Sequence, residues 1–325
     1  MQMALTLKRS GLEVVVLGRW AGKGFQSRLK EAGVPVFHTI SPTVGNFWFD
    51  RKAAELNHDV IVTDSNRSFP LAQRLKRVTG ALVFTFFLDP PAETTYKKGR
   101  SISELQNGSD AWFSTETPIL KILRSLDDSK PKFLLKRPLT GLIRPTPVPL
   151  SRDPFRVLCI SRLSGFKSSG PLALLRDSLR LREKIPSLEI TFVGGGWRIM
   201  RFAIEAMKIN IRAGNKFLKV IGTQIRPQPW YEWASVICAG STTAAEGILA
   251  NRPVIAFTYY WFGLVTPENS EEAVNNFFAQ KPTLLNIRDN PELIRRELVN
   301  LYNSWNTIAV SENAKAVRSV VEPYY

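Results

Sequence analysis

The sequence has 325 residues, of which 44% are hydrophobic and 22% are charged; this balance is typical of a soluble globular protein and excludes a disordered chain. Its 44 Lys and Arg residues against 28 Asp and Glu residues give a formal net charge of +16. That excess indicates an anionic partner, which could be nucleic acid, the inner face of a membrane or a phosphorylated substrate, whereas the alternative is a generally basic surface. No run approaches the roughly 20 apolar residues of a membrane-spanning helix, and no signal peptide is visible.

The first half alternates short apolar runs with longer amphipathic ones. Helical patterns lie at Gln26–Ala32 and Pro70–Thr79. Near-continuous apolar strands separated by helices are typical of a parallel sheet that is covered on both faces. The predicted strands of this half are Glu13–Gly18, Val34–His38, Asp59–Thr63, Ala81–Leu88 and Ala111–Phe113.

A proline-rich stretch, Leu139–Pro154, predicts a stiff, extended linker, because proline fixes φ and disfavours helix in the residue before it. A second alternation follows. Two consecutive α/β units predict two Rossmann-like, doubly wound domains that face a cleft. The predicted strands of the second half are Arg156–Ile160, Glu189–Val193, Leu218–Ile221, Val236–Ala239 and Val254–Phe257, with helices at Pro171–Lys184, Arg198–Ile211 and Thr243–Ala250.

The two cysteines, Cys159 and Cys238, each lie inside an apolar, β-branched run. A cysteine in such a run packs as a small buried hydrophobe, and neither a disulfide framework nor a zinc-ligand spacing is available. This usage fits a reducing compartment. We therefore expect a cytoplasmic protein. Its net positive charge suggests that it could attach peripherally to the inner face of the membrane.

The loops that follow the second-half strands carry the strongest chemical signal. One of them contains Arg162 and Lys167 and suits a diphosphate, because arginine offers a fork of hydrogen bonds, lysine a point charge and the next helix its N-terminal dipole. The next loop contains Gly194 and Gly195, where backbone could approach a ligand closely, although a plain tight turn is the more frequent explanation.

A loop of small residues follows the strand Val236–Ala239 and opens a helix whose first turn can bind phosphate through backbone N–H groups and hydroxyls. Glu246 lies about one turn into that helix. Its carboxylate could interact with the helix dipole or accept hydrogen bonds from ribose hydroxyls. The small residues are Gly240, Ser241, Thr242 and Thr243.

Together these stretches resemble the donor domain of family 4 and related GT-B glycosyltransferases. RVLCISRLSGFKSSGPLALL is similar to the strand, loop and helix that open that domain, and LEITFVGGGW to its next strand and glycine-rich turn. WYEWASVICAGSTTAAEGILANRPVIAF resembles its most characteristic stretch, and GLVTPEN the loop beyond. The resemblance covers about half of the chain and rests on several motifs that occur in the right order.

The resemblance implies a GT-B architecture with an acceptor-side domain at 1–144, a donor-binding domain at 145–305 and a C-terminal helix at 306–325 that packs back on the first domain. It implies that Arg162 and Lys167 hold the donor diphosphate and stabilise the charge of the leaving group. It further implies that Glu246 accepts ribose hydroxyls, that the small-residue loop lines the phosphate and sugar, and that Ile221 and Gly222 border the base. No metal or other cofactor is implied, because protein cations replace Mg²⁺.

Two features depart from the family pattern. Family 4 members usually carry a sugar-contacting glutamate eight positions before the ribose glutamate, where this chain has Cys238; the family number and the stereochemical outcome therefore stay open. In addition, the helical run Ala4–Arg9 precedes the strand Glu13–Gly18, so we expect the first strand and glycine-rich loop of related enzymes to be missing.

The first half offers fewer candidates. Asp89, after Ala81–Leu88, is the best candidate for a catalytic base, since related enzymes place a His or Asp there, and Asp64 is next. An N-cap role is the commoner explanation for either carboxylate. His38 follows a strand and could face the cleft, whereas we expect His58 to be structural.

Basic residues of the first half are interleaved with aromatic ones, a combination that suggests docking on anionic lipid with a lipid-linked or polymer acceptor. A solvated basic face is the alternative. The basic residues are Lys97, Lys98, Arg100, Arg124, Lys130, Lys132, Lys136 and Arg137.

The leading hypothesis is a transferase that moves a sugar from a UDP- or GDP-type donor to a hydroxyl of an envelope glycan, a lipid-linked acceptor or a small molecule. One alternative is a nucleotide-sugar epimerase of the same fold, which needs more acid–base side chains than the chain offers near the cleft. Another is an inactive relative that binds a nucleotide sugar or a partner protein. Nucleic-acid binding rests on charge alone and lacks a recognition element.

Overall fold

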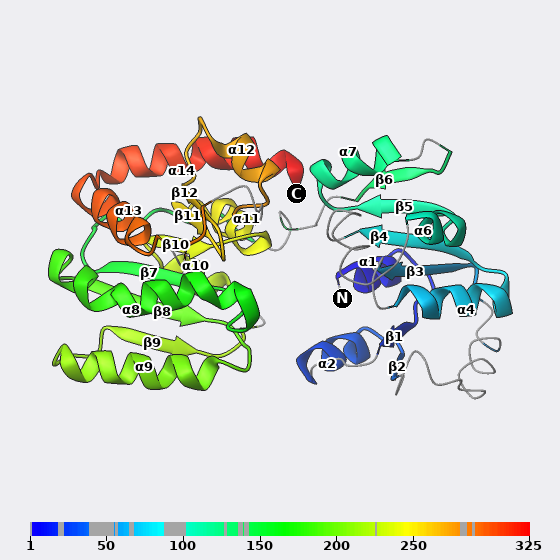
Figure 1. Ribbon diagram of the computed structural model, residues 1–325, viewed down its shortest axis with the longest axis horizontal. Coiled ribbons are helices and arrows are strands. Elements are labelled where there is room, and N and C mark those ends of the chain that lie inside the picture. The colour runs from blue at the N-terminus through cyan, green and yellow to red at the C-terminus, as the bar shows by residue number, and fades with distance from the viewer. Residues whose placement is uncertain are drawn as a thin grey trace. The chain divides into compact units, whose positions relative to one another are not determined.

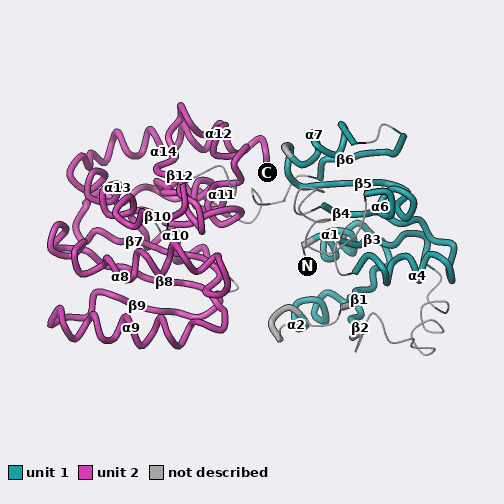
Figure 2. Tube along the Cα trace, in the orientation of Figure 1, with its two compact units in different colours: residues 1–137 teal, residues 138–325 magenta. Residues whose placement is uncertain are grey.

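The computed structural model describes residues 2–18, 23–38, 55, 58–64, 68–87, 102–126, 129–135, 139, 143–224, 226–279, 285–287 and 290–325. The chain divides into two compact units, residues 1–137 and 138–325 (Figure 2). Within the described ranges no helix is long and apolar enough to cross a membrane.

The strands described in the first unit form two parallel sheets, one with the order β1-β2 and one with the order β3-β4-β5-β6 (Figure 1). All five predicted strands are present. The strand β6 and the helices α6 and α7 were not predicted. The described elements are α1 (Gln2–Arg9), β1 (Val16–Gly18), α2 (Lys23–Glu31), β2 (Val36–His38), β3 (Val60–Asp64), α4 (Phe69–Thr79), β4 (Leu82–Phe87), α6 (Ile102–Gly108), β5 (Ala111–Ser114), α7 (Thr117–Leu126) and β6 (Lys132–Leu134).

Local sequence explains why α4 and β4 adjoin. Pro70 stands in the first turn of α4, where its missing N–H is not needed. Gly80 ends the helix at φ 73°, and its N–H bonds to the carbonyl of Lys76. Asp110 then accepts hydrogen bonds from the Lys76 ammonium at 2.6 Å and from the Val83 N–H at 2.7 Å. Although burial opposes the charge of Asp110, these two donors lower its pKa.

The second unit has one sheet with the order β12-β11-β10-β7-β8-β9 among its described strands, parallel except for β12. The described elements are β7 (Phe155–Ile160), η1 (Gly165–Ser168), α8 (Ser169–Lys184), β8 (Leu188–Val193), α9 (Ile199–Arg212), β9 (Leu218–Ile221), α10 (Gln228–Trp233), β10 (Val236–Ala239), α11 (Thr242–Leu249), β11 (Val254–Phe257), β12 (Trp261–Leu264), α12 (Ser270–Asn275), α13 (Glu292–Asn303), α14 (Thr307–Val321) and η2 (Glu322–Tyr324).

Helices cover both faces of this sheet (Figure 1). On one face α8, α9 and α13 pack against Phe155 and Phe192, and on the other α10, α11 and α14 pack against Leu158 and Ile237. The C-terminal helix α14 contacts α11 and α12 of the same unit. The predicted α/β, doubly wound class is confirmed.

The strand order places a topological switch between β7 and β10, because the chain runs from β7 to β8 and β9 on one side and then crosses to β10 and β11 on the other. In open α/β sheets, ligands bind at such a switch, beyond the carboxyl ends of the strands. The switch therefore marks where a site is expected in the second unit.

A buried arginine ties the linker to this sheet. Arg252 is 3% exposed, and its guanidinium donates to the carbonyls of Ala234 at 2.8 Å, Thr146 at 3.0 Å and Glu232 at 3.1 Å. Burial lowers the pKa of Arg252 to about 10, so the side chain is still charged at neutral pH. The guanidinium thus provides a hydrogen-bond donor to the carbonyl groups at the end of α10 and holds the linker at Thr146, before β7.

Replacing Arg252 by methionine should lower the free energy of unfolding of the second unit by about 3 kcal/mol, because the buried carbonyl group of Ala234 and the carbonyl groups of Thr146 and Glu232 lose their donor. Urea unfolding followed by circular dichroism measures the change. Arg176→Met on the exposed face of α8 is the matched control and should change stability by about 0.5 kcal/mol or less. Equal effects of the two substitutions would contradict the assigned role.

Candidate functional site

The loops after β7 and β8 are fastened to each other at the switch point. The Ser161 N–H donates to the Val193 carbonyl at 3.1 Å, and the Leu163 N–H donates to the Gly195 carbonyl at 2.9 Å. The Arg198 N–H donates back to the Leu163 carbonyl at 3.2 Å. The two loops therefore form one surface at the carboxyl ends of the strands.

The glycine-rich turn is required by this close approach. Gly194 has φ +150°, and a Cβ atom there would collide with the Ser161 carbonyl oxygen. Gly196 has φ +149°, and a Cβ atom there would lie 2.5 Å from the Leu163 carbonyl oxygen. A Cβ atom on Gly195 would collide with the Thr223 side-chain hydroxyl. Loop packing alone accounts for these glycines, and a role toward a ligand stays a prediction for Gly194 and Gly195.

Three cationic residues belong to this surface. Arg162 is exposed in the loop after β7 and forms no ion pair within the described part of the chain. Lys167 lies in η1, whose backbone is held by a bond from the Ser161 hydroxyl to the Lys167 carbonyl at 3.2 Å. Arg198, which the sequence did not single out, donates to the Ser168 hydroxyl at 2.9 Å and stacks 4.5 Å from the Trp197 ring. Its position just after a glycine-rich turn, before α9, was the available signal.

The loop after β10 is held by a second set of contacts, centred on Thr258. The Thr258 carbonyl accepts from the Gly170 N–H at 2.8 Å, and its buried hydroxyl donates to the Ala279 carbonyl at 2.7 Å. A Cβ atom on Gly240 would collide with the Thr258 methyl group and lie 2.8 Å from the Phe278 carbonyl oxygen. The start of α8 and the loop after β10 therefore meet at Thr258.

This region stores backbone strain. Ser241 has φ 59°, and the consecutive residues Phe277, Phe278 and Ala279 have φ of 50°, 48° and 71°, values that non-glycine residues rarely adopt. The Ser241 N–H holds the Phe278 carbonyl at 3.2 Å. Strained residues persist where surrounding contacts over-determine them, and they cluster at functional sites.

Glu246 is positioned by a fully buried tyrosine. The Tyr231 hydroxyl of α10 donates to the Glu246 carboxylate of α11 at 2.5 Å. Burial, together with the charge of Glu246, raises the pKa of Tyr231 well above its usual value, so this hydroxyl remains a donor. The sequence indicated Glu246, but its partner 15 residues away had no local signal.

The other predicted donor-side residues lie at the same edge of the sheet. The Gly194 N–H donates to the Ile221 carbonyl at 3.1 Å, so the ends of β8 and β9 adjoin, and Gly222 follows directly. Thr242 and Thr243 form the partly exposed first turn of α11.

Cys238 occupies the position of the expected sugar-contacting glutamate and is fully buried in β10, in register with Cys159 of β7. Burial raises the pKa of both thiols, so each stays protonated and inert. The Cys238 side chain belongs to the hydrophobic core.

The first-unit candidates are only partly described. Asp64 ends β3, where its N–H bonds to the Ser68 hydroxyl at 3.2 Å. His38 ends β2, and its side chain lies outside the described part. Asp89 lies outside the described residues altogether.

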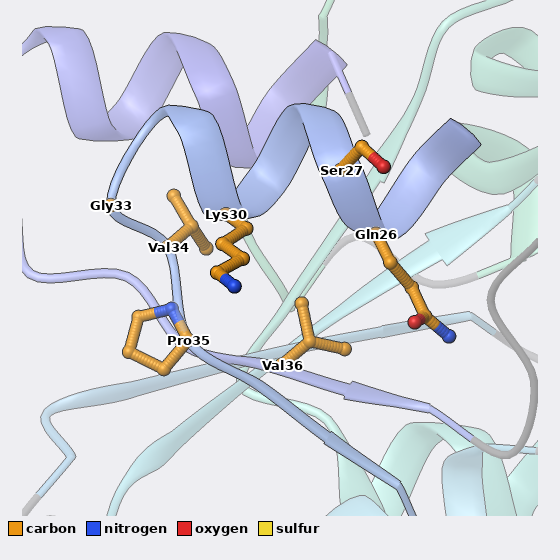
Figure 3. Close-up of a pocket in the computed structure, with 7 residues that line it drawn as sticks. All are labelled: Gln26, Ser27, Lys30, Gly33, Val34, Pro35 and Val36. Carbon is orange, nitrogen blue, oxygen red and sulfur yellow. The ribbon is translucent and has the colours of Figure 1, made fainter. Parts of the chain in front are cut away.

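A separate pocket of about 680 Å³ lies in the first unit between α2 and the chain entering β2 (Figure 3). Lys30 is its charged lining residue, and it contains none of the predicted site residues. Among the residues that the structure describes, no group of three His, Cys, Asp or Glu side chains is placed to hold a metal ion.

Two Rossmann-like α/β units, the second with its loops gathered at the switch point, are the architecture of GT-B glycosyltransferases, and the chain has this fold. No family model and no curated protein matches the sequence.

Three solved structures illustrate the likeness. The glycosyltransferase from Rickettsia africae ESF-5 is 18% identical with a TM-score of 0.68, over 100% of this chain and 89% of that one. Anabaena HepE in complex with UDP and glucose is 15% identical with a TM-score of 0.69, over 99% of this chain and 90% of that one. TarM from S. aureus is 17% identical with a TM-score of 0.58, over 85% of this chain and 55% of that one. At these identities the likeness establishes the fold.

Replacing Thr258 by valine keeps the shape of the side chain but removes the hydroxyl that bonds Ala279. The free energy of unfolding should fall by about 2 kcal/mol, since a buried carbonyl is left unpaired in a strained segment. Thr258→Ser, which keeps the hydroxyl, should cost about 1 kcal/mol or less. Urea titration of both variants measures the difference, and a valine variant as stable as the serine variant would refute the role of this hydroxyl.

Proposed function

We propose that the chain is a glycosyltransferase that binds a UDP- or GDP-type nucleotide sugar at the switch point of its second unit. The observation that carries the proposal is Glu246, held by the buried Tyr231 hydroxyl at 2.5 Å. A carboxylate fixed in this way, beside a loop that opens a helix, suits the two hydroxyls of a ribose. The complex of Anabaena HepE with UDP-glucose, in a structure of the same fold, supports this assignment.

The cations of the β7 and β8 loops would bind the diphosphate. In the transfer, the bond between the sugar C1 and the diphosphate oxygen breaks, the acceptor oxygen bonds to C1, and the acceptor proton passes to a base. Arg162 and Lys167 would offset the negative charge that grows on the leaving diphosphate, with Arg198 close to Ser168 as a third cation. These cations support a step without a metal ion or other cofactor. The phosphate, sugar and base would be enclosed by the backbone of Gly194, Gly195 and Gly240–Thr243, together with Ile221 and Gly222.

On the acceptor side we propose Asp89 as the base, with Asp64 and His38 as further candidates, and a hydroxyl of an envelope glycan, a lipid-linked molecule or a small molecule as acceptor. TarM, whose fold is similar, was solved with UDP and α-GlcNAc-glycerol. A neutral acceptor hydroxyl needs a base to receive its proton, and a carboxylate at a strand end can have a suitable pKa.

A second candidate function is nucleotide-sugar binding without turnover. The observation that favours it is Cys238, because a buried, protonated thiol stands where family 4 enzymes place a carboxylate toward the transferred sugar. Donor hydrolysis or transfer, detected as release of nucleoside diphosphate that depends on the sugar nucleotide, separates the two functions.

Titration with UDP, GDP, ADP and their sugar conjugates should raise the melting temperature of the second unit only for the compounds that carry one of the three bases. At a ligand concentration of about 100 times Kd, binding to the folded state contributes about 2.7 kcal/mol, which corresponds to a shift of about 5 °C or more. Differential scanning fluorimetry measures it. If none of these compounds shifts the transition, the donor site is not where we place it.

The ribose role of Glu246 predicts a specific discrimination. The wild-type chain should bind the preferred nucleoside diphosphate about tenfold more tightly than its 2′-deoxy form, because a charge-assisted hydrogen bond is lost. Glu246→Ala should weaken binding of the ribose-containing nucleoside diphosphate and abolish the preference for it over the 2′-deoxy form. Tyr231→Phe should reduce the preference while leaving the diphosphate contacts intact.

Isothermal titration calorimetry gives the dissociation constant of each ligand for the wild type and for each variant. A Glu246→Ala variant that keeps the full preference for the ribose form would exclude this residue from the ribose contact. Arg162→Gln is the matched control, since it should weaken both ligands by the same factor.

A further inference from the structure

Helix α9 has an apolar face that neither the fold nor the proposed donor site uses. Its inner face packs on the sheet through Phe202, Ala206 and Ile209. Trp197 is 73% exposed, Met200 68% and Ile211 72%, although all three are large and apolar. Ile204 and Met207 are exposed as well.

The five exposed side chains form one stripe. They follow one another along the chain at intervals of three and four residues, the spacing that places side chains on one face of a helix. The stripe begins at Trp197, just before the helix, and continues through Met200, Ile204, Met207 and Ile211. At 100° per residue, this face is turned away from the stripe that Phe202, Ala206 and Ile209 bury. The helix is thus apolar on two separate faces, and one of them is covered by protein.

Basic residues border the exposed stripe on both sides. Arg201, Lys208 and Arg212 lie along one flank of α9, at helical spacing. On the other flank a groove runs between α9 and β9, and its lining joins Met207 and Ile211 to Lys216 and Lys219.

All five cations are exposed, and none of them forms an ion pair with a carboxylate that the structure describes. Glu205 is the single acidic residue of α9. An apolar stripe between rows of free cations, with a tryptophan at one end, matches the surface of a helix that lies in the interface of an anionic bilayer.

We propose that α9 docks the second unit on a bilayer that contains anionic phospholipid. Met200, Ile204, Met207 and Ile211 enter the boundary between headgroups and acyl chains, and Trp197 lies at the headgroup level. The flanking lysines and arginines bind lipid phosphates, each contributing on the order of fivefold to the affinity. This docking does not depend on sugar transfer.

A second copy of the chain fits the same face less well. Because both flanks of the stripe are cationic, a symmetric contact would bring rows of cations against rows of cations, and like charges in an interface are repelled. The formal net charge of +16 adds to this repulsion. The lipid surface supplies the opposite charge that the face requires.

Two of the basic residues that the sequence indicated in the first unit, Lys130 and Lys132, are less suited to the role. The Lys132 ammonium donates to the Lys130 carbonyl at 2.9 Å and lies 5.8 Å from the Trp112 ring, and the Lys130 ammonium donates to the Ser109 carbonyl. Both side chains are engaged within the fold.

Sedimentation of the full chain with phosphatidylcholine vesicles, with and without phosphatidylglycerol, tests the proposal. The wild type should pellet only with the anionic vesicles, and less as salt is added. The triple variant Arg201→Gln/Lys208→Gln/Arg212→Gln should bind roughly a hundredfold more weakly. The triple variant Met200→Gln/Ile204→Gln/Met207→Gln should also lose most binding at unchanged charge.

The matched control is Arg176→Gln/Lys184→Gln/Lys315→Gln, which removes the same charge from exposed positions outside α9 and should bind like wild type. Equal losses in both charge variants would show diffuse attraction and overturn the proposal, as would failure of the wild type to bind. A dimer in analytical ultracentrifugation that the Met200→Gln/Ile204→Gln/Met207→Gln variant dissociates would assign the face to a second copy. Nucleotide-induced thermal shifts should be the same in all variants, so failure here is separable from failure of the donor site.

Discussion

The close approach of backbone segments around Thr258 is the constraint on which the donor-side surface depends. Its carbonyl fixes the start of α8 through Gly170, and its hydroxyl fixes Ala279 in a left-handed conformation. Gly240 can lie against it only because glycine has no side chain. These contacts hold the loop after β10, from which α11 (Thr242–Leu249) begins, and Glu246 of that helix accepts a hydrogen bond from the Tyr231 hydroxyl.

The sequence predicted most of the second unit, because its parallel strands are buried on both faces and appear as continuous apolar runs. It missed β12, since Trp261–Leu264 follows β11 after a short connection without a glycine or proline turn signal. In the first unit the three-residue strand β6 lacked such a run. For the site, it indicated residues in the strand-end loops or just after them, such as Arg162 and Glu246, but not Tyr231, Thr258 or Arg198. Those act through contacts between segments distant in sequence, which no local pattern encodes.

The second unit divides its chemistry between two regions. The carboxyl ends of the strands hold the cations, the glycine-rich turn and Glu246, whereas the outer face of α9 is apolar and bordered by free cations. Trp197 joins the two regions, because it begins the exposed stripe and stacks with Arg198 beside the β7 loop. A bilayer bound at α9 would thus lie next to the donor-side loops, which suits an acceptor carried by lipid.

The central claim is that one surface, built from the loops after β7, β8 and β10, binds the nucleotide part of the donor. Hydrogen–deuterium exchange of the full chain with and without the nucleoside diphosphate tests it directly. We expect slower exchange in 161–168, 194–198 and 240–246, with little change in α9 and α14. Protection that falls outside these loops, at a ligand concentration that saturates binding, would contradict it.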